Sequence, residues 1–290
     1  MPELTPLYTL LAHLCPLDCM QSRFMQQALL ALLLLAPMTA AMGILVVNFR
    51  MAFFAEAISH SAFTGVALGM LLTVSPELTM PLFGLAVGLG IVAAQHHSSL
   101  ASDTVIGVFF SGMVAFGLAM VSRDRSLARD MQRFLYGDIL TISETEIWVL
   151  LLLACVVLVF LALSYNRLLY AGLDETLART HRVSVLPLQY VFCGILALLV
   201  MFAVQAIGVF LVTALLVVPA ATARNLSGSA GGMFWWAVLV SEISAGTGLI
   251  ISAQDWAQTA TGATIILIAC GFFAASLLVI RLSLDRKSVV

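Results

Sequence analysis

Charged residues are scarce in this chain of 290 residues. Asp, Glu, Lys and Arg together make up 10% of the sequence, whereas 62% of the residues are apolar and the mean hydropathy is +1.08. A soluble chain carries about a quarter charged residues, and neither a soluble domain nor a disordered chain accommodates so much apolar surface. The apolar residues come in long runs rather than alternating, which argues against a membrane β-barrel. The composition therefore predicts an all-α, polytopic helical membrane protein.

Lysine occurs once, as Lys287 near the C-terminus. A phosphate-binding loop of the GxxxxGK[ST] type needs a lysine after glycines, so this chain has none. We therefore expect that any ATP that drives the protein is hydrolysed on another chain. We also expect that this chain is not itself an enzyme. The formal net charge of −2 argues against a nucleic-acid partner. Cys15 and Cys19 lie near His13, but their spacing matches no zinc module.

Apolar runs of about twenty residues, the length that crosses a bilayer, recur along the chain. They predict about nine spans in a single domain over residues 25–290, preceded by an interfacial segment over residues 1–24. The division between the sixth and seventh spans is the least distinct, because only Ala206 and Ile207 separate them. The spans are predicted at 25–47, 52–73, 81–97, 104–121, 147–164, 186–205, 207–223, 233–252 and 261–281.

The distribution of basic residues orients these spans. With the N-terminus outside, the inner segments hold eight basic residues and the outer segments five, so the positive-inside rule mildly favours this orientation. The outer arginines between 123 and 133 alternate with acidic residues, as in a solvated stretch or a docking surface for an external partner. The inner set is Arg50, Arg167, Arg179, Arg182, Arg224, Arg281, Arg286 and Lys287, and the outer set is Arg23, Arg123, Arg125, Arg129 and Arg133.

The second predicted span carries a narrow polar stripe. Glu56 and His60 are four residues apart, so a helix places both on one face, and Thr64 extends the same row. A carboxylate at this depth costs about 2.5–3.5 kcal/mol on translocon scales and avoids lipid. One interpretation is a structural hydrogen bond between the two side chains. The other is a transient site for a proton or a divalent cation, because a carboxylate oxygen and an imidazole nitrogen suit Mn(II), Fe(II) or Zn(II).

Two further residues at membrane depth are candidates for a pathway. Glu242 lies near the middle of the eighth span, either as a buried hydrogen-bonded group or as part of the pathway. Pro219 lies near the inner end of the seventh span and removes one backbone hydrogen bond. It predicts either a plain kink or a broken helix that lines the pathway.

The longest polar inner segment runs over residues 165–184. Asp174 and Glu175 are predicted to open a short helix there, and Arg179 follows one turn later, an order that suits the helix dipole. This segment is either a simple connector or the surface through which a motor protein pushes on the bundle.

Four segments of the chain together resemble ABC-type manganese, zinc or iron permeases, the integral membrane subunits of metal importers. They read RMAFFAEAISHSAFTGVALG from 50 to 69, FLYGDIL from 134 to 140, ALLVVPAATAR from 214 to 224 and TGATIIL from 261 to 267. The resemblance extends from about Phe24 to the C-terminus, and the combination of segments is specific where any single one is not.

The resemblance implies an importer-type permease bundle in the bacterial plasma membrane. It implies a pair of permease chains, identical or paralogous, with two ATP-hydrolysing subunits inside and an external metal-binding protein. It also implies that Glu56 and His60 lie on the path of a transported Mn, Zn or Fe ion, with no permanently bound cofactor. The residues that it implies for coupling to the ATPase are Asp174, Glu175, Ala178 and Arg179.

The chain departs from the family pattern at three positions. Glu56 stands where Asp is common, Ala55 replaces the usual Gly, and Arg182 stands where the coupling segment usually has Gly. A glutamate reaches one methylene further than an aspartate, so the metal preference cannot be copied from the family. The alternatives are a permease of the same architecture for a metal chelate or cofactor, and a membrane scaffold without transport. An intramembrane protease is disfavoured because no HExxH or GxSG motif occurs.

Overall fold

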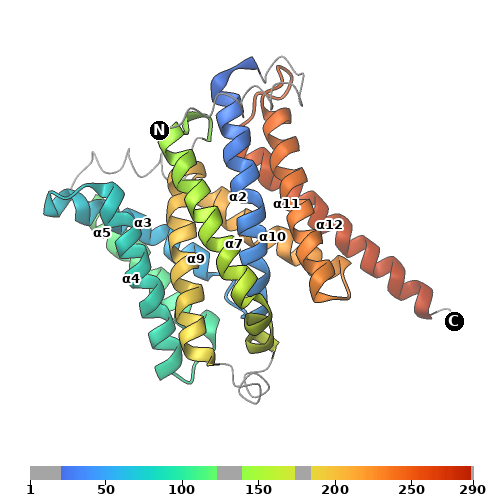
Figure 1. Cartoon of the computed structure of the whole chain (residues 1–290), viewed down its shortest axis with the longest axis horizontal. Helices are drawn as coiled ribbons and strands as arrows, with labels where there is room; N and C mark the ends of the chain where they lie inside the picture. Colours follow the sequence, from blue (N-terminus) through green and yellow to red (C-terminus); the bar gives the residue numbers. More distant parts are fainter. Residues whose placement is uncertain (1–20, 123–138, 174–183, 289–290) are drawn as a thin grey trace.

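The structure is a computed structural model that describes residues 21–122, 139–173 and 184–288. Within these ranges it contains nine long α-helices, one short 3₁₀ helix and no strand (Figure 1). The elements are α2 Arg23–Asn48, α3 Phe54–Leu72, α4 Pro76–His97, α5 Ser102–Val121, η2 Ile139–Thr141, α7 Glu144–Leu173, α9 Val185–Ile207, α10 Val209–Leu226, α11 Ala230–Ser252 and α12 Thr261–Ser288. Each predicted span corresponds to one long helix, so the all-α prediction is confirmed.

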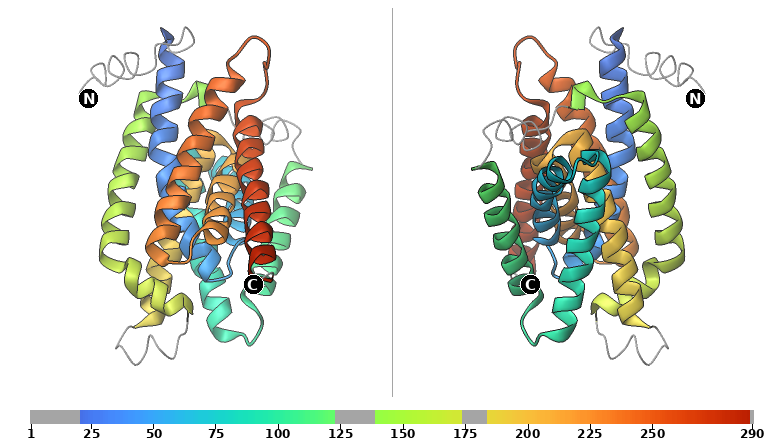
Figure 2. Two further views of the ribbon diagram at one scale, coloured as in Figure 1. Left: turned by 90° about the vertical axis from the view of Figure 1, so that its right-hand side faces the viewer. Right: turned by 90° about the vertical axis from the view of Figure 1, so that its left-hand side faces the viewer.

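Eight of the described helices are long and apolar enough to cross a membrane. Helix α3 carries the polar residues Glu56, Ser59, His60 and Ser61 in its first two turns. The right-hand view of Figure 2 looks nearly along the axis of α3, whereas α4 beside it is seen from the side. Helix α3, which carries the predicted site, therefore lies at a large angle to α4 instead of running parallel to it.

Helix α2 forms the centre of the molecule. About 72% of its apolar stretch is buried, against 17% for α5 and α12, which lie at the periphery of the chain. Helices α7, α9, α10 and α11 pack against α2, while α3 packs against α4, α5, α9 and α10. Figure 1 accordingly shows α3, α4 and α5 on one side, α2, α7 and α9 in the middle, and α11 and α12 on the other side.

Glycines permit close contacts between helices at several places in the bundle. A Cβ atom on Gly65 would lie 2.8 Å from the Cα of Met80 on α4, so only glycine lets these two backbones meet. Gly43 of α2 faces the backbone carbonyl of Leu216 on α10 in the same way. Small residues of this kind are the usual means of tight packing between membrane helices.

The division between the sixth and seventh predicted spans is confirmed. Helix α9 ends at Ile207, α10 begins at Val209, and Gly208 between them has φ 84° and ψ 163°. Side chains avoid this region of backbone space, so glycine makes the sharp joint possible. Helix α10 then continues through Pro219 to Leu226. Of the two alternatives for Pro219, the structure therefore excludes the broken helix, because α10 stays helical through the proline.

The C-terminal end of α7 differs from the sequence prediction. Helix α7 continues to Leu173, well past the predicted end at 164, so the first part of the inner segment 165–184 is a continuation of that helix. The polar residues Asn166 and Arg167 are tolerated because they lie near the helix end. The predicted coupling residues Asp174, Glu175, Ala178 and Arg179 lie outside the described residues, as do residues 1–20 and 123–138.

Candidate metal site on helix α3

A tight connection from α2 places Glu56 in the first turn of α3. Five residues join the two helices, and Arg50 among them has the positive φ of 56° that a sharp reversal requires. Met51 and Phe54 are almost completely buried and anchor the connection to the core. A carboxylate in the first turn of a helix is favoured by the helix dipole.

The side chains of Glu56 and His60 meet as their spacing predicted. Glu56 Oε1 lies 3.4 Å from His60 Nε2, and the side chains are 32% and 18% exposed respectively. This separation is longer than a typical hydrogen bond of about 2.7–3.2 Å. With metal–ligand bonds of about 2.1 Å, it corresponds to a ligand–metal–ligand angle of about 108°, near the tetrahedral value. The two donor atoms are thus spaced to bind one cation together.

Two buried hydroxyls accompany this pair on α3. Ser59 and Thr64 are 0% exposed, and their hydroxyl oxygens have no hydrogen-bond partner within the part of the chain that the structure describes. Ser61 shows the usual alternative, because its hydroxyl donates to the carbonyl of Ile58 at 2.6 Å. A buried polar group without a partner costs about 1–3 kcal/mol.

Glu242 is not brought to this pair. It is partly buried on α11, whose neighbours are α2, α10 and α12, whereas α3 packs against α4, α5, α9 and α10. Pro219 is buried on α10, which packs against α3 as well as against α11. A role for either residue in the pathway stays a prediction.

Within the described part of the chain, no third His, Cys, Asp or Glu side chain joins Glu56 and His60. Among the residues described, no group of three or more His, Cys, Asp or Glu side chains is close enough to hold a metal ion. His96 and His97 lie exposed at the end of α4 with ring centroids 5.5 Å apart, and His97 Nδ1 lies 2.8 Å from the carbonyl oxygen of Ala93. Within the described residues, Glu56 and His60 therefore stand as a pair of potential ligands and not as part of a larger cluster.

Sequence reasoning missed the aromatic residues around His60. The rings of Phe63 on α3 and Phe110 on α5 both lie against the imidazole. The spacing of three residues between His60 and Phe63 could have indicated the first contact. No signal in a single sequence indicates the second contact, because Phe110 belongs to a different helix.

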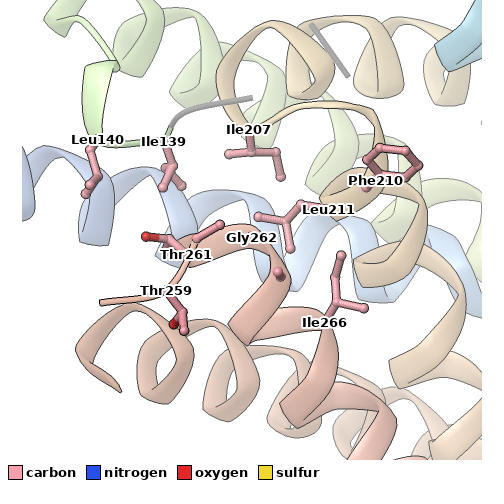
Figure 3. Close-up of a pocket in the computed structure, with 11 residues that line it drawn as sticks. Ile139, Leu140, Ile207, Phe210, Leu211, Thr259, Thr261, Gly262 and Ile266 are labelled. Carbon is pink, nitrogen blue, oxygen red and sulfur yellow. The ribbon is translucent and has the colours of Figure 1, made fainter. Parts of the chain in front are cut away.

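A pocket of about 530 Å³ lies at the opposite end of α9 and α10 from the inner segment. Figure 3 shows that η2, the α9–α10 joint and the start of α12 surround it. Its walls are mainly aliphatic, with the hydroxyls of Thr259 and Thr261 as polar groups. Ile139 and Leu140 end one of the four family-like segments and Thr261 begins another, so these two segments, distant in sequence, meet here.

The comparisons agree with this architecture. A model of the ABC 3 transport family matches residues 21–280. The chain is 30% identical to the high-affinity zinc uptake system membrane protein ZnuB of Haemophilus influenzae over 86% of this chain and 95% of that protein. It is 30% identical to the manganese transport system membrane protein MntC of Listeria monocytogenes over 88% of this chain and 90% of that protein.

A solved structure is also similar to this chain in fold and in sequence. PsaBC from Streptococcus pneumoniae, in complex with a Fab, superposes with a TM-score of 0.75 at 28% identity, over 88% of this chain and 91% of the matched chain. These relatives are bacterial, and eight described helices of this chain suit a membrane, so it is a multi-pass protein of the bacterial plasma membrane. From the match over nearly all of its described residues, the chain belongs to the ABC 3 transport family.

Proposed function

We propose that this chain is the permease subunit of an ATP-driven importer for a divalent transition metal, with Mn, Zn or Fe as the cargo. The observation that carries the proposal is the Glu56–His60 pair, two metal-binding atoms 3.4 Å apart on a helix inside a membrane bundle. Relatives named for zinc and for manganese are equally similar to this chain, which supports a metal cargo without selecting one. The chain has no GxxxxGK[ST] loop, because its single lysine is Lys287, so ATP is proposed to bind to a partner chain.

In this proposal, the ion passes α3 by exchanging ligands. Glu56 supplies a carboxylate oxygen and His60 an imidazole nitrogen, which together suit first-row divalent metals. Thr64 and Ser59 offer hydroxyls that a water in transit, or the ion itself, satisfies. A site with two strong ligands binds weakly enough to release its ion inside.

The proposed transport cycle needs partner chains. An external metal-binding protein delivers the ion, and ATP-binding subunits favour one of two states of the bundle. Asp174, Glu175, Ala178 and Arg179 are the proposed contacts with the ATPase, since they directly follow α7, which packs against α2 and α9. A second permease chain completes the pathway, and Glu242 and Pro219 are proposed to lie along it.

Uptake into vesicles tests the assignment. The purified permease and ATPase are reconstituted with the external binding protein, and uptake of radiolabelled Mn, Zn and Fe is measured with ATP inside. We expect His60→Ala to abolish uptake of the cargo metal while the variant still inserts and assembles, because half of the ligand pair is lost. His97→Ala is the matched control, since His97 lies exposed at the end of α4. Wild-type uptake by His60→Ala at equal protein levels would refute the site.

A further inference from the structure

The imidazole of His60 lies against two phenyl rings. The ring of Phe110 has its centroid 5.1 Å from that of His60 at an interplanar angle of 85°, and the ring of Phe63 lies at 5.9 Å and 66°. Both arrangements are edge-to-face, the favoured geometry of aromatic pairs. Phe63 follows on the same helix, whereas Phe110 comes from α5. The functional histidine is thus contacted by a neighbouring helix as well as by its own.

The face of α5 that carries Phe110 runs along α3. Gly117 lies seven residues after Phe110, on the same face, and a Cβ atom there would be 3.7 Å from Thr64 Oγ1 and 3.8 Å from Phe63 Cβ. Phe109 points elsewhere, because its ring lies 3.4 Å from where a Cβ on Gly90 of α4 would be. Two adjacent phenylalanines on α5 therefore contact different helices, and only Phe110 contacts the histidine.

The ring contacts limit how the imidazole can turn. An imidazole ring rotates broadly about its terminal torsion when nothing surrounds it. With phenyl rings on two sides, the ring of His60 keeps the orientation in which Nε2 faces Glu56 Oε1 at 3.4 Å. Rigid support of this kind keeps two ligands in the geometry that one ion needs.

We infer that Phe110 is a positioning residue for the transported ion: it holds the His60 imidazole toward Glu56, so that the carboxylate and the ring nitrogen bind one divalent metal together. This inference rests on the proposed function, since it assigns a role beside the proposed ligand pair. It also makes α5 part of the site. A movement of α5 that withdraws Phe110 frees the imidazole and weakens metal binding, which couples the position of a helix to the affinity for the ion.

The test is Mn²⁺ binding to the purified complex of permease and ATP-binding subunits in lipid nanodiscs, without the external protein. We expect Phe110→Leu and Phe110→Met to raise the dissociation constant about two- to tenfold, the range for one aromatic pair. Phe110→Tyr keeps the ring and is expected to stay within twofold of wild type. Phe109→Leu, the matched control on the adjacent residue, is expected to bind like wild type. Pulsed EPR reports whether imidazole nitrogen remains bound to Mn²⁺, and that signal is expected to weaken only in the first two variants.

The outcomes separate this inference from the proposed function. If Phe110→Leu and Phe110→Met bind Mn²⁺ like wild type while His60→Ala does not, Phe110 has no positioning role and the proposed function stands. An equal loss in Phe109→Leu, or no recovery in Phe110→Tyr, would also overturn the inference. If His60→Ala itself binds Mn²⁺ like wild type, the proposed ligand pair is wrong. Assembly and thermal unfolding of every variant are compared with wild type, and Phe110→Met preserves most of the side-chain volume in case Phe110→Leu unfolds.

Discussion

Thr39 and Thr64 are both completely buried, yet they differ in their hydrogen bonding. The hydroxyl of Thr39 donates to the carbonyl of Leu35 at 2.8 Å, the usual solution in a helix. The hydroxyl of Thr64 has no such partner within the described chain, although it lies one turn from His60. The buried hydroxyl of Thr64 costs free energy without a compensating hydrogen bond, which points to a role other than stabilising the fold.

Replacing Thr64 by Val separates stability from transport. We expect Thr64→Val to leave the thermal midpoint of the purified permease unchanged or slightly raised, because the buried hydroxyl without a partner is removed. Metal uptake by reconstituted vesicles is expected to fall several-fold. Thr39→Val is the control and should lower stability by about 0.5–1.5 kcal/mol through its lost hydrogen bond. Full uptake by Thr64→Val would remove Thr64 from the pathway.

Residue spacing predicted one half of the site and not the other. The interval of four between Glu56 and His60 fixes their proximity through local helix geometry, and the structure places their donor atoms 3.4 Å apart. The contact between His60 and Phe110 depends on how α3 and α5 pack, because the two residues are fifty positions apart in sequence. Such packing follows from the whole bundle, and hydrophobic runs in a single sequence do not encode it.

At the scale of elements, apolar runs located every long helix that the structure describes, but not the tilt of each helix. Span length and hydropathy fixed the nine helices, because a buried membrane segment must satisfy its backbone internally. Span length and hydropathy did not reveal that α3 lies at a large angle to its neighbour α4 (Figure 2). In this orientation α3 approaches α4 closely at Gly65 and Met80 and also packs against α5 and α9. Tilt is set by contacts with neighbours, which composition does not record.

The contact between α2 and α10 depends on the absence of a side chain at Gly43. We expect Gly43→Ala to destabilise the permease by about 1–3 kcal/mol, the usual cost of overpacking, because the new methyl group meets the backbone of Leu216. Gly246→Ala on α11 is the matched control, since nothing lies within 4 Å of a Cβ there. Thermal unfolding in detergent measures both variants. Equal midpoints for the two would mean that α2 and α10 do not need this close approach.

At the scale of the whole molecule, the two ends of the described bundle differ in structure. Helices α4 and α7 both end, and α9 begins, at the lower end in Figure 1, which is the inner end in the predicted orientation. The apolar pocket lined by Ile139, Ile207 and Gly262 lies at the other end. Helix α7 has 30 residues and packs against the central helix α2. In the proposed cycle, a force that the ATP-binding subunits apply to the inner end of α7 therefore acts directly on the central helix α2.

This arrangement predicts where the ATP-binding subunits bind to the permease. We expect the double reversal Asp174→Lys and Glu175→Lys to reduce co-purification of the ATP-binding subunits, because it inverts the charge of the segment that directly follows α7. The matched control is the double reversal Glu77→Lys and Asp255→Lys, which makes the same charge change at exposed positions of the opposite end. Association of charged surfaces weakens with salt, so the loss should be larger at low ionic strength than at high. If both double variants retain the ATPase like wild type, the acidic pair does not contribute to docking, and the push must enter the bundle through another inner connection, such as the one between α10 and α11.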